Sequence, residues 1–259
     1  MGYILQDWIA AVHGWRFWLR FGILDINLKY RRTYLGPLWI TLSFCFTAAG
    51  LAFVYSTLFK VDDEVYIAYL VTGLAVWMFV SGTIIDGTSS LMRHSALIRE
   101  SNLPILSHAC RCVVSSAINF LHNLVIVIGV MFYANITPTL GTILVIVGIF
   151  LLLINSIWMT LFFGLICVRY RDLPPLISTI TNLMFLVTPV FWYRDMLGSR
   201  ALLADLNPFY HLIELVRSPV LGVPAEPGSY IYVVVLCVVG WTATFFLATK
   251  HQVRLAFWI

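Results

Sequence analysis

The chain has 259 residues, of which 61% are hydrophobic and only 11% are charged, whereas soluble domains carry about 25% charged residues. A water-soluble domain could not bury that much apolar surface, so we expect the lipid bilayer to be the main solvent. The net charge of +4 is small, and we expect no nucleic-acid partner. The five cysteines lie mostly inside apolar runs, which is typical of buried side chains and not of a disulfide framework.

Residues 1–34 are predicted to form an amphipathic helix on the membrane surface. Over residues 7–32, one helical stripe is apolar and carries Trp8, Val12, Trp15, Leu19, Ile23 and Ile26. The opposite stripe is polar and carries His13, Arg16, Arg20, Asn27 and Arg31. An aromatic apolar face opposite a basic one suits an anionic membrane surface, and a soluble helix packed on a neighbour is the alternative.

Six apolar runs are long enough to cross a membrane, since a span needs about 20 residues. They are residues 36–59, 66–85, 110–134, 139–167, 174–193 and 229–249. Between the last two, residues 194–228 contain an apolar stretch at 209–221 that is too short to cross. We therefore predict an all-α membrane protein: an interface helix, then a transmembrane domain over 35–259 with six transmembrane helices and a re-entrant segment at 194–228. A seventh span there is the alternative.

The distribution of Lys and Arg predicts the orientation, because these residues concentrate in cytoplasmic loops. With a cytoplasmic N-terminus, six spans put most of the 16 Lys and Arg residues on the cytoplasmic side. The other side keeps Lys60, Arg194, Arg200 and Arg217. Both termini are therefore predicted to be cytoplasmic. Because Arg16 and Arg20 stand where a signal peptide would be apolar, the first span is expected to be an uncleaved anchor.

Motifs for nucleotide hydrolysis and metal catalysis are missing from the sequence. No Lys follows a Gly, no G-x-G occurs, and there is no H-E-x-x-H, which excludes the phosphate loop, the dinucleotide fingerprint and the zinc-protease motif. We expect no catalytic residue, metal site or bound cofactor on this chain. If ATP drives transport, another subunit must supply the ATPase.

Polar residues inside the apolar runs are candidates for function. Asp86, near the cytoplasmic end of the second run, is interpreted as an interfacial charge beside Arg93. The asparagines of the later runs are expected to tie helices together by hydrogen bonds; they are Asn119, Asn123, Asn155 and Asn182.

Four stretches of the sequence carry a family resemblance. They are Arg31–Trp39 (RRTYLGPLW), Leu97–Leu106 (LIRESNLPIL), Arg169–Pro174 (RYRDLP), and Thr188–Trp192 (TPVFW) followed by Leu206–His211 (LNPFYH) and Glu214–Arg217 (ELVR). In this order and spacing they resemble the permease subunit of a type-2 ABC exporter, in the branch that exports polysaccharides. One departure is Leu103, where the family often has an aromatic residue before the proline.

The resemblance implies a homodimer in the bacterial inner membrane with two copies of an ABC ATPase subunit, which would hold ATP and Mg²⁺. It implies export of a lipid-linked glycan through a path at the dimer interface. The motif Leu35–Trp39 favours O-antigen on a polyprenyl diphosphate carrier over capsular polysaccharide or teichoic acid. A drug exporter permease and an integral membrane enzyme acting on lipids are the remaining alternatives.

Three sets of site residues follow from this reading. The expected substrate path is lined by Trp39, Phe44, Phe46, Tyr55, Trp77, Phe185, Thr188 and Phe191. Arg31 and Arg32 are expected to meet the carrier diphosphate, since guanidinium groups bind phosphate well. The expected ATPase contacts are Arg20, Arg93, Arg99, Glu100, Arg171 and Asp172. Any single ring could instead face lipid or pack between helices.

The sequence Thr188-Pro189 predicts a break near the outer end of the fifth run, because proline removes one helix hydrogen bond. The segment that follows is expected to return into the outer half of the membrane and to form the exit. Its arginines would then line a watery cavity, or they would pair with the nearby acids Asp195, Asp205 and Glu214.

Overall fold

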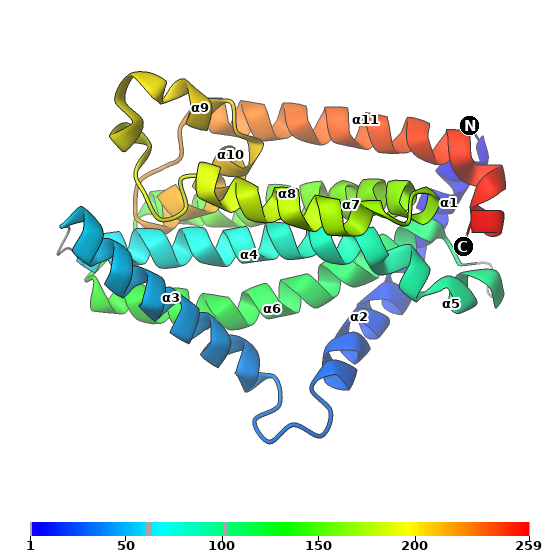
Figure 1. The fold of residues 1–259 in the computed structure, drawn as a ribbon, viewed down its shortest axis with the longest axis horizontal. Coiled ribbons are helices and arrows are strands. Elements are labelled where there is room, and N and C mark those ends of the chain that lie inside the picture. The colour runs from blue at the N-terminus through cyan, green and yellow to red at the C-terminus, as the bar shows by residue number, and fades with distance from the viewer. Residues whose placement is uncertain (1, 61–63, 101–102, 259) are drawn as a thin grey trace.

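A computed structural model describes residues 2–60, 64–100 and 103–258, and the described residues form helices and connections without a strand (Figure 1). The helices are α1 Gly2–His13, α2 Trp15–Lys29, α3 Leu38–Phe59, α4 Glu64–Arg93, α5 Ser95–Glu100, α6 Ile105–Tyr133, η1 Leu140–Ile143, α7 Leu144–Arg169, α8 Leu173–Val187, η2 Arg194–Arg200, α9 Leu202–Asp205, α10 Pro208–Val220 and α11 Pro227–Trp258. Both termini, α1 and α5 lie at one end of the bundle, and η2, α9 and α10 lie at the other (Figure 1).

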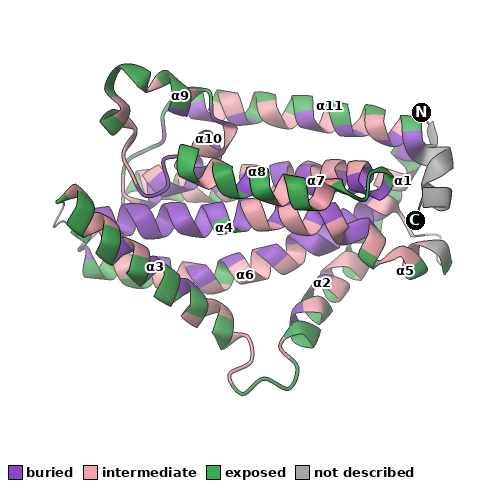
Figure 2. Cartoon of the chain, viewed as in Figure 1, coloured by how far each residue is buried: buried purple, intermediate pink, exposed green. Residues whose placement is uncertain are grey.

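Helix α4 is the centre of the bundle (Figure 2). In its most apolar stretch 78% of the residues are buried, against 22% or 28% in the other helices of spanning length. Glycines let α7 approach it closely: a Cβ on Gly87 would lie 2.8 Å from Cα of Thr160, and a Cβ on Gly164 would lie 3.1 Å from the carbonyl oxygen of Gly87. Small residues at helix contacts are typical of packing in membranes, where backbones approach closely.

Five helical segments are long and apolar enough to cross a membrane, namely α3, α4, α6, η1 with α7, and α11. They correspond to five of the six predicted spans. The remaining predicted span, the fifth in chain order at 174–193, is not confirmed, because α8 ends at Val187 after 15 residues. That is about 22 Å of helix, short of the roughly 30 Å of hydrocarbon. Thr188 has an extended backbone with ψ 134°, as expected before Pro189, so the predicted break is confirmed.

Residues 194–228 fold into η2, α9 and α10 instead of one long helix. Helix α10 has 13 residues, about 20 Å, which is too short for the seventh span considered above. It packs between α4, α7 and α11. Its insertion into the outer half of the membrane stays a prediction.

The helix predicted over 7–32 is divided in two at Gly14, and its position on a membrane surface stays a prediction. Gly14 has φ −79° and ψ 21°, and glycine inside a helix costs roughly 1 kcal/mol relative to alanine. The packing of α1 gives a second reason: Trp8 lies edge-on to Trp241 of α11, with ring centroids 5.1 Å apart. The predicted apolar stripe is therefore divided, since Trp8 is packed on protein while Val12 is 66% exposed.

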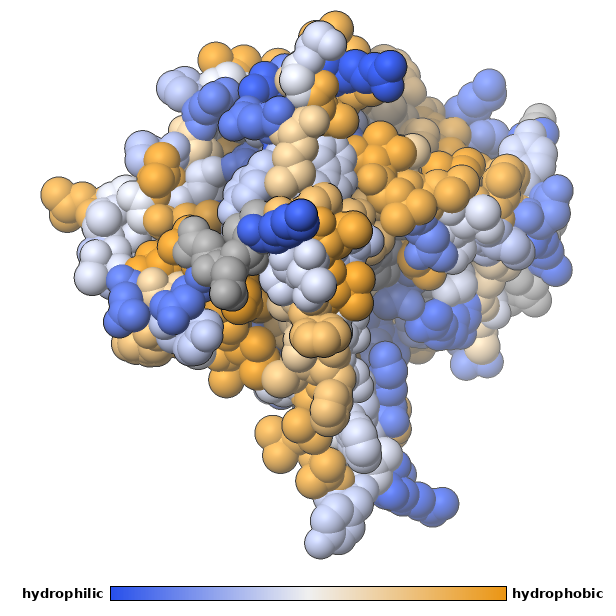
Figure 3. Space-filling model, turned by 60° about the vertical axis from the view of Figure 1, so that its left-hand side comes forward, coloured by the Kyte–Doolittle hydropathy of each residue, from blue (hydrophilic) through white to orange (hydrophobic). Residues whose placement is uncertain are grey.

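Helix α2 is anchored on α6 and then leaves the bundle. Where they cross, a Cβ on Gly22 would lie 2.6 Å from Cγ1 of Val114. Arg111, only 8% exposed, donates to both carboxylate oxygens of Asp25 at 2.6 and 2.5 Å. Beyond this pair the end of α2, residues 30–37 and the start of α3 project from the bundle as an arm (Figures 1 and 3). Apolar side chains cover much of the arm in Figure 3, with hydrophilic ones near its tip.

Replacing Arg111 by methionine is expected to release α2 from α6. The change removes both hydrogen bonds to Asp25, and hydrogen bonds to charged groups contribute about 1.5–3 kcal/mol, somewhat less here because the Asp25 side chain is 31% exposed. Proteolysis within 30–37 should then be faster. The matched control is Arg93→Met, because Arg93 lies 3.8 Å from Asp86 and both side chains are about half exposed. Equal proteolysis of the two variants would contradict the anchoring role.

Candidate functional site

Four residues predicted to contact an ATPase lie at the end of the bundle that carries both termini (Figure 1). Arg93 ends α4, Glu100 ends α5, and Arg171 and Asp172 form the turn between α7 and α8. All four are exposed. The structure thus brings them to one face, which we call the loop face: the C-terminal end of α4, α5, and residues 170–172.

The other two predicted contacts differ. Arg20 is exposed but lies in the middle of α2, which leads away from the loop face toward the arm. Arg99 belongs to α5, and its side chain lies outside the described part of the chain. Contact of any of these residues with an ATPase stays a prediction.

Asp7 of α1 closes the N-terminus of α6 beside the loop face. Its carboxylate lies near the backbone N–H groups of Ile105 and Leu106, the first residues of α6. Such N–H groups have no partner within the helix, and a negative charge there is favourable. Burial raises the pKa of Asp7, and the nearby backbone N–H groups partly offset that rise. Nothing local in the sequence indicates this contact, because Asp7 and α6 are far apart along the chain.

At the opposite end, Arg217 joins α10 to its neighbours. Its side chain is completely buried and pairs with Glu214 of the same helix. Nη1 donates to the carbonyl oxygen of Pro189 at 2.7 Å, and the guanidinium lies 3.7 Å from the ring centroid of Tyr69 on α4. Arg217 is thus a structural link between α4, α10 and the segment after α8, not a charge facing a watery cavity.

A second ion pair holds the segment that precedes α10. Arg194 donates two hydrogen bonds of 2.6 Å to Asp205, which lower the pKa of the Asp205 carboxyl. The ring of His211 contacts the backbone oxygen of Asp205 at 2.7 Å and the hydroxyl of Ser229 at 3.0 Å. The alternative that the outer arginines pair with nearby acids is therefore correct for Arg194 and Arg217.

Four predicted path residues form an aromatic cluster at this end: Tyr55, Trp77, Phe185 and Phe191. Tyr55 of α3 stacks on Phe191 with ring centroids 4.2 Å apart. Phe185 lies 5.4 Å from Phe191 and 5.5 Å from Trp77 of α4. The hydroxyl of Tyr66 fixes the backbone by donating to the carbonyl oxygen of Phe191 at 2.7 Å. The cluster therefore connects α3, α4 and α8, and its contact with substrate stays a prediction.

Thr188 lies beside this cluster and is fully buried. Its hydroxyl donates to the carbonyl oxygen of Met184 at 2.7 Å and accepts from Nδ2 of Asn207 at 2.9 Å. Asn207 in turn caps α10, since Oδ1 accepts from the N–H of Phe209 at 2.9 Å. Thr188 therefore joins the end of α8 to the start of α10.

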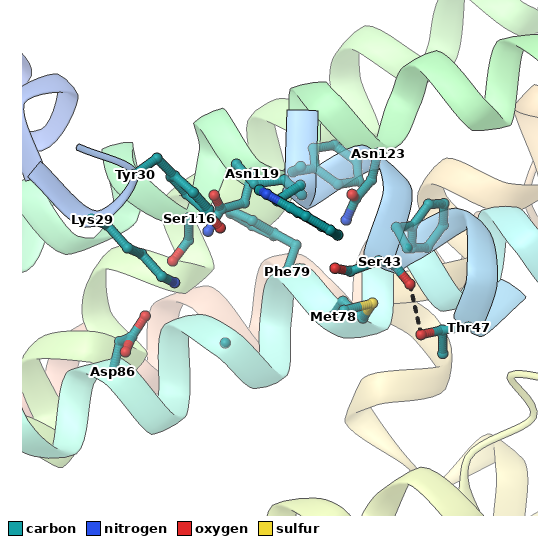
Figure 4. A pocket seen from close by; sticks show the side chains of 15 residues that line it. Lys29, Tyr30, Ser43, Thr47, Met78, Phe79, Asp86, Ser116, Asn119 and Asn123 are labelled. Carbon is teal, nitrogen blue, oxygen red and sulfur yellow. Dashed lines mark hydrogen bonds between the residues drawn. The ribbon is translucent and has the colours of Figure 1, made fainter. Parts of the chain in front are cut away.

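The remaining predicted residues lie elsewhere. Trp39 and Phe44 line a hollow of about 460 Å³ between the arm, α4 and α6 (Figure 4). Phe46 is 75% exposed and does not line it. Arg31 and Arg32 are exposed on the arm, where Arg32 has the left-handed φ of 68°. Contact of the two arginines with a diphosphate, and of the rings with substrate, stays a prediction.

The expectation that asparagines tie helices together is wrong for Asn155. Its two hydrogen bonds, to the carbonyl oxygen of Leu151 and from Nε1 of Trp158, both 2.9 Å, stay within α7. Oδ1 of Asn119 and Oδ1 of Asn123 are buried and have no hydrogen-bond partner in the described structure. Both side chains line the same hollow as Trp39.

Comparison with known proteins identifies the family. Residues 24–221 match the ABC-2 type transporter family. An O-antigen export system permease protein RfbA of Klebsiella pneumoniae is 23% identical over 85% of both chains. Another RfbA of that organism is 23% identical over 73% of this chain and 74% of the relative. An RfbA of Myxococcus xanthus is 22% identical over similar shares, 73% and 74%.

The family match covers most of the chain and includes α3, α4, α6, α7, α8 and α10. Five helices of spanning length agree with a membrane subunit that crosses the bilayer several times. A permease of this kind implies an ATPase as partner subunit. The chain therefore belongs to the ABC-2 type transporter family and is the multi-pass membrane subunit of a transporter, not an enzyme.

Proposed function

We propose that this chain moves a lipid-linked polysaccharide, O-antigen on a polyprenyl diphosphate carrier, from the cytoplasm across the bacterial inner membrane. It acts as a homodimer with two ATPase subunits, which bind ATP and Mg²⁺, and both of its termini are cytoplasmic. The observation that carries the proposal is the match to an O-antigen export permease over 85% of both chains. Capsular polysaccharide and teichoic acid are the nearest alternative cargoes.

The arrangement of the chain supports this proposal. The loop face carries exposed Arg93 and Arg171, which suits a cytoplasmic partner and the cytoplasmic excess of basic residues. The aromatic cluster lies at the opposite end, where a glycan would leave, and aromatic faces bind sugar rings. Arg194 and Arg217 of that end are paired within the protein, so these two add little free charge to an exit.

Deleting the gene tests the function. The deleted strain is expected to lose surface O-antigen and to accumulate lipid-linked glycan on the cytoplasmic side, and the restored gene is expected to reverse both. Immunoblots of surface glycan and analysis of the lipid-linked pool measure these effects. Unchanged O-antigen together with loss of capsule, of teichoic acid or of drug efflux would overturn the O-antigen assignment.

The proposed orientation predicts opposite labelling of two exposed positions. A membrane-impermeant maleimide should label Ser199→Cys, in η2, from outside spheroplasts, and Ala96→Cys, in α5, only after permeabilisation. Both positions are exposed on the protein, so a difference in labelling reports which side of the membrane each position lies on. The parent chain, whose Cys45 is exposed, measures background labelling. Labelling of Ala96→Cys from outside would reverse the orientation.

Charge reversal on the loop face is expected to uncouple transport. Arg171→Glu places a like charge beside Asp172, and unfavourable charge at an interface weakens association. We expect about a tenfold fall in transport-stimulated ATPase activity, with normal membrane insertion. The matched control is Arg200→Glu, exposed at the opposite end, which should keep coupling. If both variants hydrolyse ATP like the parent, the loop face is not the docking site.

A further inference from the structure

The hollow between the arm and the bundle is lined by Trp39 and Phe44, two of the residues expected on the substrate path, and its polar lining has not been assigned a role above. It has a volume of about 460 Å³, in the range of small-ligand sites. A neighbouring hollow of about 570 Å³ shares Lys29, Asp86 and Asn119 with it. We call the two together the arm groove. It is bounded by α2, α3, α4 and α6 of one protomer.

Two asparagines of α6 line the arm groove, and the amide oxygen of each is buried without a hydrogen-bond partner. Asn123 is only 4% exposed, and its Oδ1, like that of Asn119, has no hydrogen-bond partner. The residues are four apart, so they lie on one face of the helix, and Figure 4 shows both in the wall of the hollow. Leaving a buried polar atom without a hydrogen-bond partner is unfavourable. This cost is removed when a ligand supplies hydrogen-bonding groups.

The rest of the lining alternates hydroxyls with aromatic rings. Ser43 and Thr47 of α3 line the same hollow (Figure 4), and the Thr47 hydroxyl donates to the carbonyl oxygen of Ser43 at 2.8 Å. The rings of Tyr30 and Phe79 form other parts of the wall. Apolar rings with a few placed polar groups are typical of small-molecule sites. A sugar offers C–H faces to such rings and hydroxyls to such amides.

The side chains that line the arm groove carry two positive and two negative charges, Lys29 and Arg93 against Asp25 and Asp86. Lys29 and Asp86 face each other across it (Figure 4). In the neighbouring hollow, Asp25 is bound to Arg111, and Arg93 lies 3.8 Å from Asp86. An anionic headgroup or a diphosphate would favour a surplus of cations. The lining therefore favours a neutral ligand with many hydroxyl groups.

We propose that the arm groove binds a neutral saccharide segment of the exported glycan within a single protomer, with Asn119 and Asn123 as its hydrogen-bonding residues. This proposal rests on the proposed function in glycan export. The arm groove and the aromatic cluster share no lining residue, so the groove is a second contact for the same cargo. The arm forms one wall of the groove, and its attachment through Asp25 and Arg111 keeps that wall in place.

Site-specific photo-crosslinking in cells that make their own lipid-linked glycan tests the proposal. Benzoylphenylalanine replaces Met78, which is 41% exposed and lines the groove, or Phe132, which is 80% exposed and does not. We expect a crosslinked band that stains for carbohydrate at Met78 and none at Phe132. Asn123→Leu should weaken the Met78 band about tenfold, as expected for a lost hydrogen bond.

Asn123→Leu removes an unpartnered polar group from a buried position, so we expect it to fold normally, as elution on size exclusion will show. The matched control is Asn182→Leu, the same change at an exposed position of α8, which should leave the Met78 band unchanged. An unchanged band in Asn123→Leu, equal bands at Met78 and Phe132, or a Met78 adduct of phospholipid or of a second copy of the chain would overturn the proposal.

The two proposals fail in different ways. If deletion of the gene abolishes surface glycan but the Met78 band carries no carbohydrate, the groove proposal fails and the export function stands. If the deleted strain keeps its surface glycan, the export function fails. A carbohydrate band at Met78 that depends on Asn123 would then still support a saccharide site, and its absence would overturn that site as well.

Discussion

Replacing Arg217 by methionine is expected to lower the free energy of unfolding by about 3–5 kcal/mol, the cost of removing one partner of a buried ion pair. The guanidinium is fully buried, and the Glu214 side chain that would lose its cation is only 15% exposed. The carbonyl oxygen of Pro189 would lose a hydrogen bond of 2.7 Å. The ring of Tyr69 would lose a cation 3.7 Å from its centroid. Unfolding of the purified protein in lipid nanodiscs measures the change.

Two further variants distinguish the contribution of the buried ion pair to stability from that of a partly exposed ion pair. Arg194→Met removes a similar double hydrogen bond to Asp205, but those side chains are 37% and 34% exposed, so we expect a loss of about 1 kcal/mol or less. The double variant Arg217→Met with Glu214→Leu removes both buried charges and should regain much of the lost stability. A loss in Arg217→Met no larger than that in Arg194→Met would show that the buried pair is unimportant.

The positions of the long helices could be predicted because they depend on local properties of the chain. Runs of apolar residues indicate the spans, and Pro189 indicates where α8 ends. The fifth span is not confirmed, because the apolar run 174–193 continues through that proline whereas helix α8 stops at Val187. The division at Gly14 was not predicted, because the apolar residues keep their helical spacing on both sides of that glycine. The contact of Trp8 with α11 joins residues far apart in the sequence and could not be predicted either.

The ion pair that joins α2 to α6 could not be predicted, since its partners are distant in sequence, whereas the pairing of Arg194 and Arg217 with nearby acids could be. Asp25 and Arg111 are 86 residues apart, and a count of arginines treats Arg111 as an ordinary cytoplasmic charge. Aromatic content likewise predicts a set of path residues without assigning their places. Phe44 and Phe46 are only two positions apart in the sequence, yet they are 1% and 75% exposed. Positions i and i+2 of a helix are about 200° apart around its axis, so they lie on opposite sides.

Gly148→Leu is expected to displace α10 and to abolish export. A Cβ at Gly148 of α7 would fall on the carbonyl oxygen of Leu215 of α10 and lie 2.8 Å from the carbonyl carbon. The obstacle is backbone, so it can give way only if α10 moves. Overpacking costs about 1–3 kcal/mol, occasionally more, and we expect the upper part of that range. Because α10 carries Arg217, its displacement also separates the guanidinium from Pro189 and releases the segment after α8.

The matched control is Gly129→Leu, on α6, where a Cβ would meet no atom within 4 Å. Leucine has a higher helix propensity than glycine, so this variant should keep its stability and its export. Surface glycan on immunoblots and unfolding in nanodiscs should both distinguish the two variants. If Gly148→Leu unfolds like the parent, α10 has room to accommodate the side chain and the close contact is wrong. If it is destabilised but still exports glycan, the contact between α7 and α10 stabilises the fold without shaping the exit, and the exit must be formed by the aromatic cluster alone.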